Sequence, residues 1–251
     1  MEETSLPRNS PVPARSVAHV PTIACFNRSN IPLGVDFDAL IAALQNYVDQ
    51  HLAPVWGTPA KLVKSTGFLK GKWALGLFAD YRDASLAGFH DVTPDGLPFA
   101  KIFVFNTLEQ GDKVSVTASH EVAEMLVDPG ANLYSAGPKA GRLYDYEVSD
   151  PVEEMSFKLD GLQMCNFVYP AYFETFHKPG SVRFDHMGRL RQPFELDKGG
   201  YQSYWVNGTE KTAWGSDEKK VRFEKEDRRG HRTTLHNKSK LKHSVERPLA
   251  K

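Results

Sequence analysis

The stretch VSVTASHEVAEMLVDP, residues 114–129, is the most informative part of the sequence for both the fold and the chemistry. Successive residues of a helix turn by about 100°, so a helix over 117–128 places His120, Glu121, Glu124 and Asp128 on one stripe. The rest of its circumference is apolar, which predicts a buried helix. Burying an imidazole and three carboxylates is costly unless a partner balances them, and a divalent cation binds both kinds of group. The stripe therefore predicts a metal site.

The spacing within this stretch assigns roles to its residues. His120 and Glu124 are one helical turn apart, so both can reach one ion, whereas Glu121 is rotated away and is free to accept a proton from a water molecule. This is the HExxH pattern of zinc hydrolases with Glu in place of the second His. A bare HExxE also occurs as an i,i+4 contact on solvated helices. The apolar remainder of this helix, and a second acidic cluster downstream, favour the metal site.

The second cluster is RLYDYEVSDPVEE, residues 142–154. A helix or turn here would put Glu147 and Asp150 on one face, with Glu147 as the third ligand and Asp150 supporting a ligand from behind. An acidic surface loop is the alternative interpretation. Asp128 lies about 12 Å beyond His120 along the helix axis, at about 1.5 Å per residue. We therefore predict it to be a cap or a supporting acceptor, with a direct ligand role as the alternative.

Composition bounds the possible functions. The 251 residues are 41% hydrophobic and 25% charged with a net charge of zero, which is typical of a globular protein without a general attraction to nucleic acid or anionic membranes. No run approaches the roughly 20 apolar residues of a membrane span, and no signal peptide is recognisable, so we expect a cytoplasmic protein. Cys25 and Cys165 are expected to be buried thiols rather than a disulfide.

Periodicity along the chain predicts an α+β fold. A helix is expected over 36–52, with Asp36 as N-cap and Pro54 as its stop, and 80–97 is expected to be a polar link in which His90 is a loop residue rather than part of a cleft rim. A hairpin is expected over 155–168 around Asp160-Gly161, and Asn207-Gly208 is expected to be a turn. Strands are expected at residues 20–26, 60–64, 73–79, 99–105 and 201–206.

The expected domain organisation has three parts. Residues 1–17 are interpreted as a disordered N-terminus and 209–251 as a disordered basic tail. Between them, residues 18–208 are expected to form one domain, with a sheet and helix lobe over 18–129 and a smaller, irregular β-rich lobe over 141–208. The ion is expected in the cleft between the lobes.

SHEVAEMLVDP followed by YDYEVSDPVE resembles the zincin metallopeptidases of the gluzincin type, most nearly uncharacterised bacterial and phage zincin-like proteins. It is similar, more distantly, to the phosphate-induced, exordium-like proteins. The resemblance covers roughly residues 100–206. It implies a zincin-like mixed sheet with a long helix and an active-site helix, a cation bound by His120, Glu124 and Glu147, and Glu121 as general base. Zn²⁺ is the expected ion. Most zincins have His where this chain has Glu124, and the resulting more anionic, harder site leaves Mn²⁺ and Ca²⁺ open.

These observations predict a metal-dependent hydrolase whose substrate is a peptide or protein. Tyr144, Tyr146 and His177 are candidates for stabilising the oxyanion, and their positions in the sequence do not choose among them. One alternative is a non-catalytic structural or phage-associated module in which a closed metal site, with Asp128 as fourth ligand, ties the lobes together. A weaker alternative is a nucleic-acid-associated protein that acts through the basic tail. The oligomeric state does not follow from the sequence.

Overall fold

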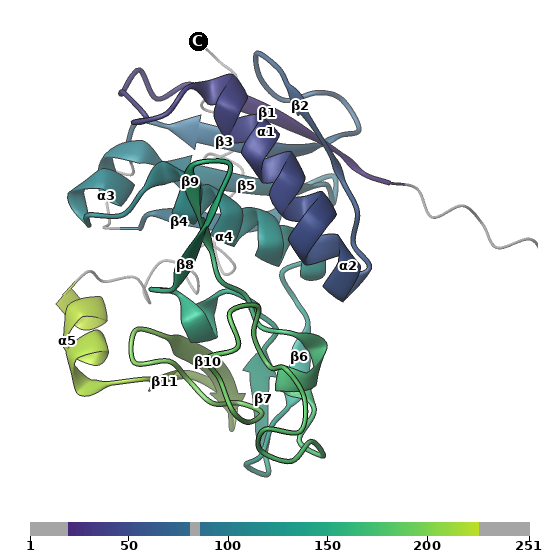
Figure 1. The fold of residues 1–251 in the computed structure, drawn as a ribbon, viewed down its shortest axis with the longest axis vertical. Coiled ribbons are helices and arrows are strands. Elements are labelled where there is room, and N and C mark those ends of the chain that lie inside the picture. Colours follow the sequence, from purple (N-terminus) through teal and green to yellow (C-terminus); the bar gives the residue numbers. More distant parts are fainter. Residues whose placement is uncertain (1–19, 81–85, 226–251) are drawn as a thin grey trace, which may run out of the picture.

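The first half of the chain forms a five-stranded mixed sheet with its covering helices (Figure 1). The computed structural model describes residues 20–80 and 86–225. The strand order is β2-β1-β3-β5-β4. The pairings of β1 with β2 and β3, and of β3 with β5, are parallel, whereas β4 runs antiparallel to β5 at one edge. The strands are β1 (Thr22–Asn27), β2 (Lys61–Lys64), β3 (Trp73–Phe78), β4 (Gly88–Val92) and β5 (Pro98–Phe103). The predicted α+β class is confirmed.

The first helix is longer than the sequence suggested. Helix α1 (Phe37–Tyr47) begins as predicted, with the Asp36 side chain accepting a hydrogen bond from the Ala39 N–H at 3.0 Å. It continues through a π-helical turn, η1 (Val48–Leu52), into α2 (Ala53–Trp56), which ends at left-handed Gly57. The expected stop at Pro54 is therefore wrong. A proline ring clashes with the carbonyl four residues before it in a regular helix, and the wider π turn relieves that clash.

Helix α4 (Val114–Val127) follows a short helix, α3 (Val104–Glu109), and is buried on nearly every side, as predicted. It packs against β4 and β5, while α1 packs against β2 and against α4 itself. Alternate strand residues such as Ile23, Leu75 and Ile102 point into the core that the helices share. The opposite face of the sheet carries a smaller cluster of Phe26, Ala74 and Phe99. The sheet thus holds α4 on its inner face.

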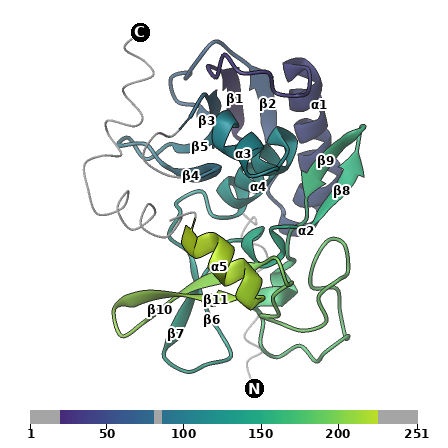
Figure 2. The ribbon, with the colours of Figure 1, turned by 90° about the vertical axis from the view of Figure 1, so that its left-hand side faces the viewer.

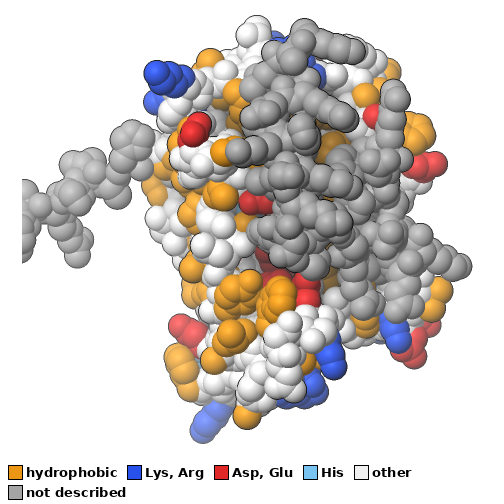
Figure 3. All heavy atoms as spheres, turned by 180° about the vertical axis from the view of Figure 1, so that it is seen from behind, with side chains coloured by type: hydrophobic (Ala, Val, Ile, Leu, Met, Phe, Trp, Pro, Cys, Tyr) orange, Lys and Arg blue, Asp and Glu red, His pale blue; other side chains and the backbone are white. Residues whose placement is uncertain are grey.

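The second half is built on a four-stranded antiparallel sheet in the order β11-β10-β7-β6. Its strands are β6 (Tyr134–Ala136), β7 (Arg142–Asp145), β10 (Tyr201–Val206) and β11 (Thr209–Trp214). Helix α5 (Asp217–Lys225) and two 3-10 turns, η2 (Asp150–Val152) and η3 (Pro170–Phe173), complete this half. Hydrophobic side chains show over the lower half of the molecule when it is seen from behind (Figure 3).

The fold extends past residue 208, where the sequence analysis ended it. Tyr201 pairs with Trp214 across β10 and β11, and the Lys219 ammonium of α5 donates to the Glu153 and Glu154 carboxylates. Disorder was expected here because the segment has few apolar residues. Cross-strand aromatic pairing and a buried ion pair hold it in place instead. The expected disordered segment 1–17 lies outside the described residues, as does the part of the basic tail from 226 onward.

A hairpin joins the two halves. Strands β8 (Ser156–Leu159) and β9 (Leu162–Cys165) are linked by Asp160 and Gly161, both with positive φ, as predicted for a primed turn. The hairpin lies against α1 and α4 (Figure 2). One hydrophobic core therefore runs through both halves. The two cysteines are buried and free, which confirms the expected thiols. Within the described residues, every helix is too short or too polar to cross a bilayer.

A histidine pair beside this hairpin is expected to make the fold sensitive to acid. The His51 Nδ1 and His186 Nε2 atoms lie 2.9 Å apart, and the ring of His186 stacks on Phe167. Burial, together with His51 and Arg183, lowers the pKa of His186 from 6.5 to about 4. As pH falls from 6.5 to 4, the unfolded chain takes up a proton that the folded chain resists, so stability is lost across that window.

We expect His186→Gln to reduce this loss, measured as the drop in melting temperature between pH 7 and pH 4.5. Other groups titrate in the same range in both proteins, so the comparison is between slopes rather than absolute temperatures. Parallel curves for the variant and the wild type would show that the pair does not contribute.

Candidate metal centre

The candidate site lies where edge strand β4 meets α4. Gly88 and His90 are alternate residues of β4, so both face the helix, and Glu121 lies opposite them. A Cβ atom at position 88 would lie 2.8 Å from the Glu121 Oε1 atom, closer than such contacts allow. Glycine at this position therefore makes room for the Glu121 carboxylate against the strand.

His120, Glu124 and Asp150 form the first of two donor groups, called here the His120 set. The His120 Nε2 atom lies 3.3 Å from Glu124 Oε2 and 3.3 Å from Asp150 Oδ1. Two ligands about 2.0–2.2 Å from a tetrahedral ion lie about 3.3–3.6 Å apart, so these spacings suit a shared cation. The structure thus brings together side chains that can hold a metal ion.

The surroundings of His120 favour positive charge. Burial by itself would lower the pKa of this imidazole, but Glu124, Asp150 and Glu121 raise it, and together they hold it well above its usual value. A proton and a divalent cation would compete for the same ring nitrogen, and the same carboxylates would stabilise either positive charge. The local electrostatics therefore match the chemistry that the donor atoms indicate.

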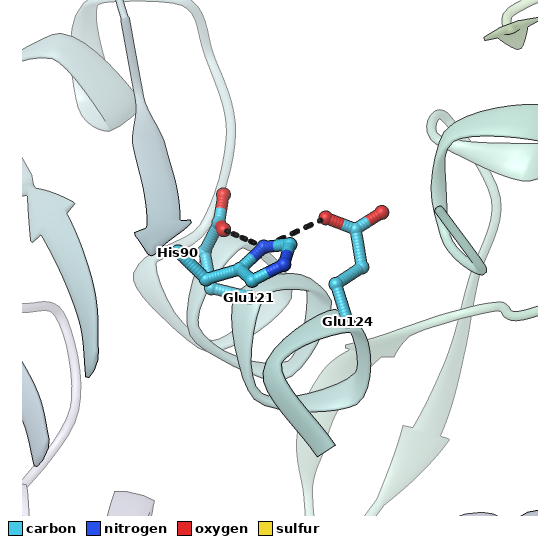
Figure 4. Close-up of side chains that lie close together, drawn as sticks. All are labelled: His90, Glu121 and Glu124. Atoms are coloured by element: carbon cyan, nitrogen blue, oxygen red, sulfur yellow. Dashed lines mark ion pairs between the residues drawn. The ribbon is translucent and has the colours of Figure 1, made fainter. Parts of the chain in front are cut away.

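His90, Glu121 and Glu124 form the second donor group, called here the His90 set (Figure 4). The His90 Nδ1 atom lies 3.7 Å from Glu121 Oε2 and 3.6 Å from Glu124 Oε2. Its other ring nitrogen, Nε2, lies 3.9 Å from Glu147 Oε2. Because Glu124 belongs to both sets, the two groups form one continuous centre.

Contacts with the second half of the chain fix α4 at this centre. The Ser149 N–H donates to Glu124 Oε1 at 3.2 Å, which leaves Oε2 directed at the two histidines. The Cys165 N–H donates to Ser119 Oγ at 2.8 Å and so holds β9 against α4. Asp150 begins η2, directly after Ser149, so the same short segment supplies a donor atom and orients another.

The predicted ligand candidates contact different partners. The predicted contact between His120 and Glu124 is present, but the carboxylate beside them is Asp150, whereas Glu147 contacts His90. Asp128 is in neither donor set. It caps the end of α4, and its Oδ2 accepts the Leu133 N–H at 2.8 Å.

The three oxyanion candidates make contacts of other kinds. Tyr144 packs between Phe194 and Tyr204. Tyr146 stacks on Phe173, and its pKa is raised mainly by burial and secondarily by the negative charge of Glu174. His177 Nε2 lies 2.7 Å from the Glu174 carboxylate. Their part in any reaction stays a prediction.

His90 is the site residue that the sequence analysis misplaced. The expected loop at 80–97 contains β4, and His90 is buried there rather than lying in a loop. A signal was present, because Pro94-Asp95-Gly96 is a turn sequence and Gly96 has a positive φ of 76°. A turn at this place predicts a hairpin of β4 with β5, whose alternation would direct His90 and Gly88 to the same side.

No protein-family model matches the chain, and searches of curated proteins and solved structures find no match either. The likeness to zincins therefore rests on the motifs SHEVAEMLVDP and YDYEVSDPVE alone.

Proposed function

We propose that this protein is a metal-dependent hydrolase that acts on peptide bonds, with a divalent cation held by His120, Glu124 and Asp150. The observation that carries the proposal is the position of Glu121. Its carboxylate lies in the same buried cluster as the ligands, yet it is not part of the His120 set. A cation site with a carboxylate beside it that is not one of that cation's ligands is the arrangement that metal-assisted hydrolysis needs.

A cation in the His120 set would polarise the scissile carbonyl and lower the pKa of a water molecule. Glu121 would accept a proton from the attacking water as a general base and would then deliver it to the leaving amine as a general acid. Gly88 allows the carboxylate to lie against β4. Ser149 orients the Glu124 carboxylate by its N–H, so that Oε2 stays directed at His120.

The donor atoms favour Zn²⁺, with Mn²⁺ next. Each set combines one imidazole with two carboxylates, and Zn²⁺ binds both ligand types in catalytic sites. Ca²⁺ prefers six to eight oxygen ligands, which a set containing a histidine nitrogen does not provide. Both Zn²⁺ and Mn²⁺ should therefore be used in reconstitution.

A second candidate function is supported by the burial of the centre. The Glu124 and Asp150 side chains are only 3% and 2% exposed. They come from the two halves of the chain, so a cation bound there would tie α4 to η2 without any reaction. In that case the metal-loaded protein would be stabilised but would hydrolyse nothing.

Metal removal distinguishes these functions. Protein loaded with Zn²⁺ or Mn²⁺ is expected to cleave members of a peptide library, detected by mass spectrometry, and a chelator should abolish the cleavage until metal is restored. Chelation should also lower the melting temperature, because an ion that binds only the folded state stabilises it. Loss of stability on chelation, without cleavage by any metal-loaded form, would support the structural role instead.

A further inference from the structure

We infer that the protein binds a second cation at the His90 set, adjacent to the first and sharing Glu124 with it. The environment of His90 supports this inference. Its side chain is 1% exposed, and within the described part of the chain neither ring nitrogen has a hydrogen-bond partner. Burying two polar nitrogens in this way is unfavourable, and such groups usually contact an ion or water.

The distances around His90 suit coordination better than hydrogen bonding. The Nδ1 contacts of 3.6 and 3.7 Å, to Glu124 and Glu121, exceed the roughly 2.7–3.2 Å of an N–H···O hydrogen bond. They lie at or just above the spacing of about 3.3–3.6 Å expected between two ligands of one tetrahedral ion. Figure 4 shows both carboxylates directed at the same edge of the imidazole ring.

The other side of the ring is also suited to a metal ligand. A histidine that binds a cation through one nitrogen commonly donates its other N–H to a carboxylate, which fixes the ring orientation. Glu147 Oε2, at 3.9 Å from His90 Nε2, is placed for this with a small movement. In this arrangement Glu147 orients His90 and is not a ligand itself.

Glu124 places the two cations next to each other. Its Oε2 atom contacts both histidines, so the two sets cannot be occupied independently. Ions that share a carboxylate in two-metal sites lie about 3.5–4 Å apart. The His120 set has the shorter spacings and should fill first, and the His90 set should fill second and more weakly.

Occupation of the second site has a functional consequence, which rests on the proposed function. A cation at the His90 set engages Glu121, the carboxylate assigned as proton acceptor. Hydrolysis should therefore rise as the first cation binds and fall as the second one binds. The second site would act as an inhibitory sensor of excess divalent metal.

Stoichiometry tests the inference without any need for a substrate. Stripped full-length protein, titrated with Zn²⁺ by calorimetry and checked by elemental analysis, is expected to bind two ions per chain. His90→Gln should bind one, and Glu121→Gln, which removes a donor of the same set from α4, should also bind one. The matched control His51→Gln, a histidine outside the centre, should bind two.

Mn²⁺ tests adjacency. Electron paramagnetic resonance should show isolated Mn²⁺ at one equivalent and an exchange-coupled pair at two. The inference is overturned if the wild type binds one ion or none, or if two bound Mn²⁺ ions do not interact. It is also overturned if His90→Gln and Glu121→Gln are both folded and each still binds two ions. Failure of the proposed function has a different signature, namely two bound ions and no hydrolysis at any metal concentration.

Discussion

Glu124→Gln is expected to weaken cation binding severely at both donor sets, because it removes the one oxygen that both histidines contact. The Ser149 N–H keeps a carbonyl oxygen at the position of Oε1, so the new amide presents its NH₂ group to His90 and His120. That group cannot bind a cation. Substitution of residues that merely orient ligands costs about 10–100-fold in affinity, so loss of this direct ligand should exceed about 100-fold. Calorimetric titration with Zn²⁺ measures the loss.

Asp128→Asn is the matched control for this variant, because it is also a carboxylate-to-amide change on α4. Asp128 is in neither donor set, and an asparagine oxygen can still accept the Leu133 N–H. The control should bind Zn²⁺ as the wild type does. If Asp128→Asn loses the ion while Glu124→Gln retains it, the cation lies at the C-terminal end of the helix and the assignment of both sets is wrong.

The local part of the site could be predicted from the sequence. The apolar circumference of residues 117–128 predicted a buried helix, and the structure has α4 over Val114–Val127 with nearly all its residues buried. The four-residue spacing predicted the contact of His120 with Glu124, which is 3.3 Å long. Both follow from helical geometry alone, which fixes neighbours one turn apart whatever surrounds them.

The long-range part of the site could not be predicted in this way. His90 reaches the cluster only because β4 pairs antiparallel with β5, and Asp150 reaches it only because β9 and Ser149 pack on α4. Periodicity carries no information about which loop returns to which helix. Glu147 and Asp150 were both recognised as acidic candidates, but their division between the two histidines depends on the bend at residues 148–149, which no pattern specifies.

The same limit explains the boundary error near residue 208. Strand β11 has few apolar residues, and its order comes from the ladder with β10 and from the pairing of Tyr201 with Trp214. Asn207-Gly208 was identified as a turn, and a turn after one strand is evidence for a second strand. Composition outweighed that signal in the interpretation, although cross-strand pairing can stabilise a polar strand.

Glu121→Gln is expected to lower the rate of peptide hydrolysis by about 10²–10⁴-fold, the range that general acid–base catalysis contributes. An amide cannot accept the proton of the attacking water, whereas its size and shape still fit against Gly88. Glu121 is outside the His120 set, so the affinity for the first Zn²⁺ and the melting temperature with one ion bound should stay close to those of the wild type. The rates are measured with one equivalent of metal, to keep the second site out of the comparison.

Glu109→Gln, the same change at an exposed position on neighbouring α3, is the control and should retain the wild-type rate. The combination of outcomes identifies the role of Glu121. A slow variant with an unchanged first cation supports a proton acceptor, because a ligand of that cation could not be replaced without weakening its binding. A slow variant that has also lost the first cation would make Glu121 a ligand and would require another base. A variant as fast as the wild type would show that another group accepts the proton of the attacking water. The proposed mechanism would then be wrong, although the two cation sites could still be correct.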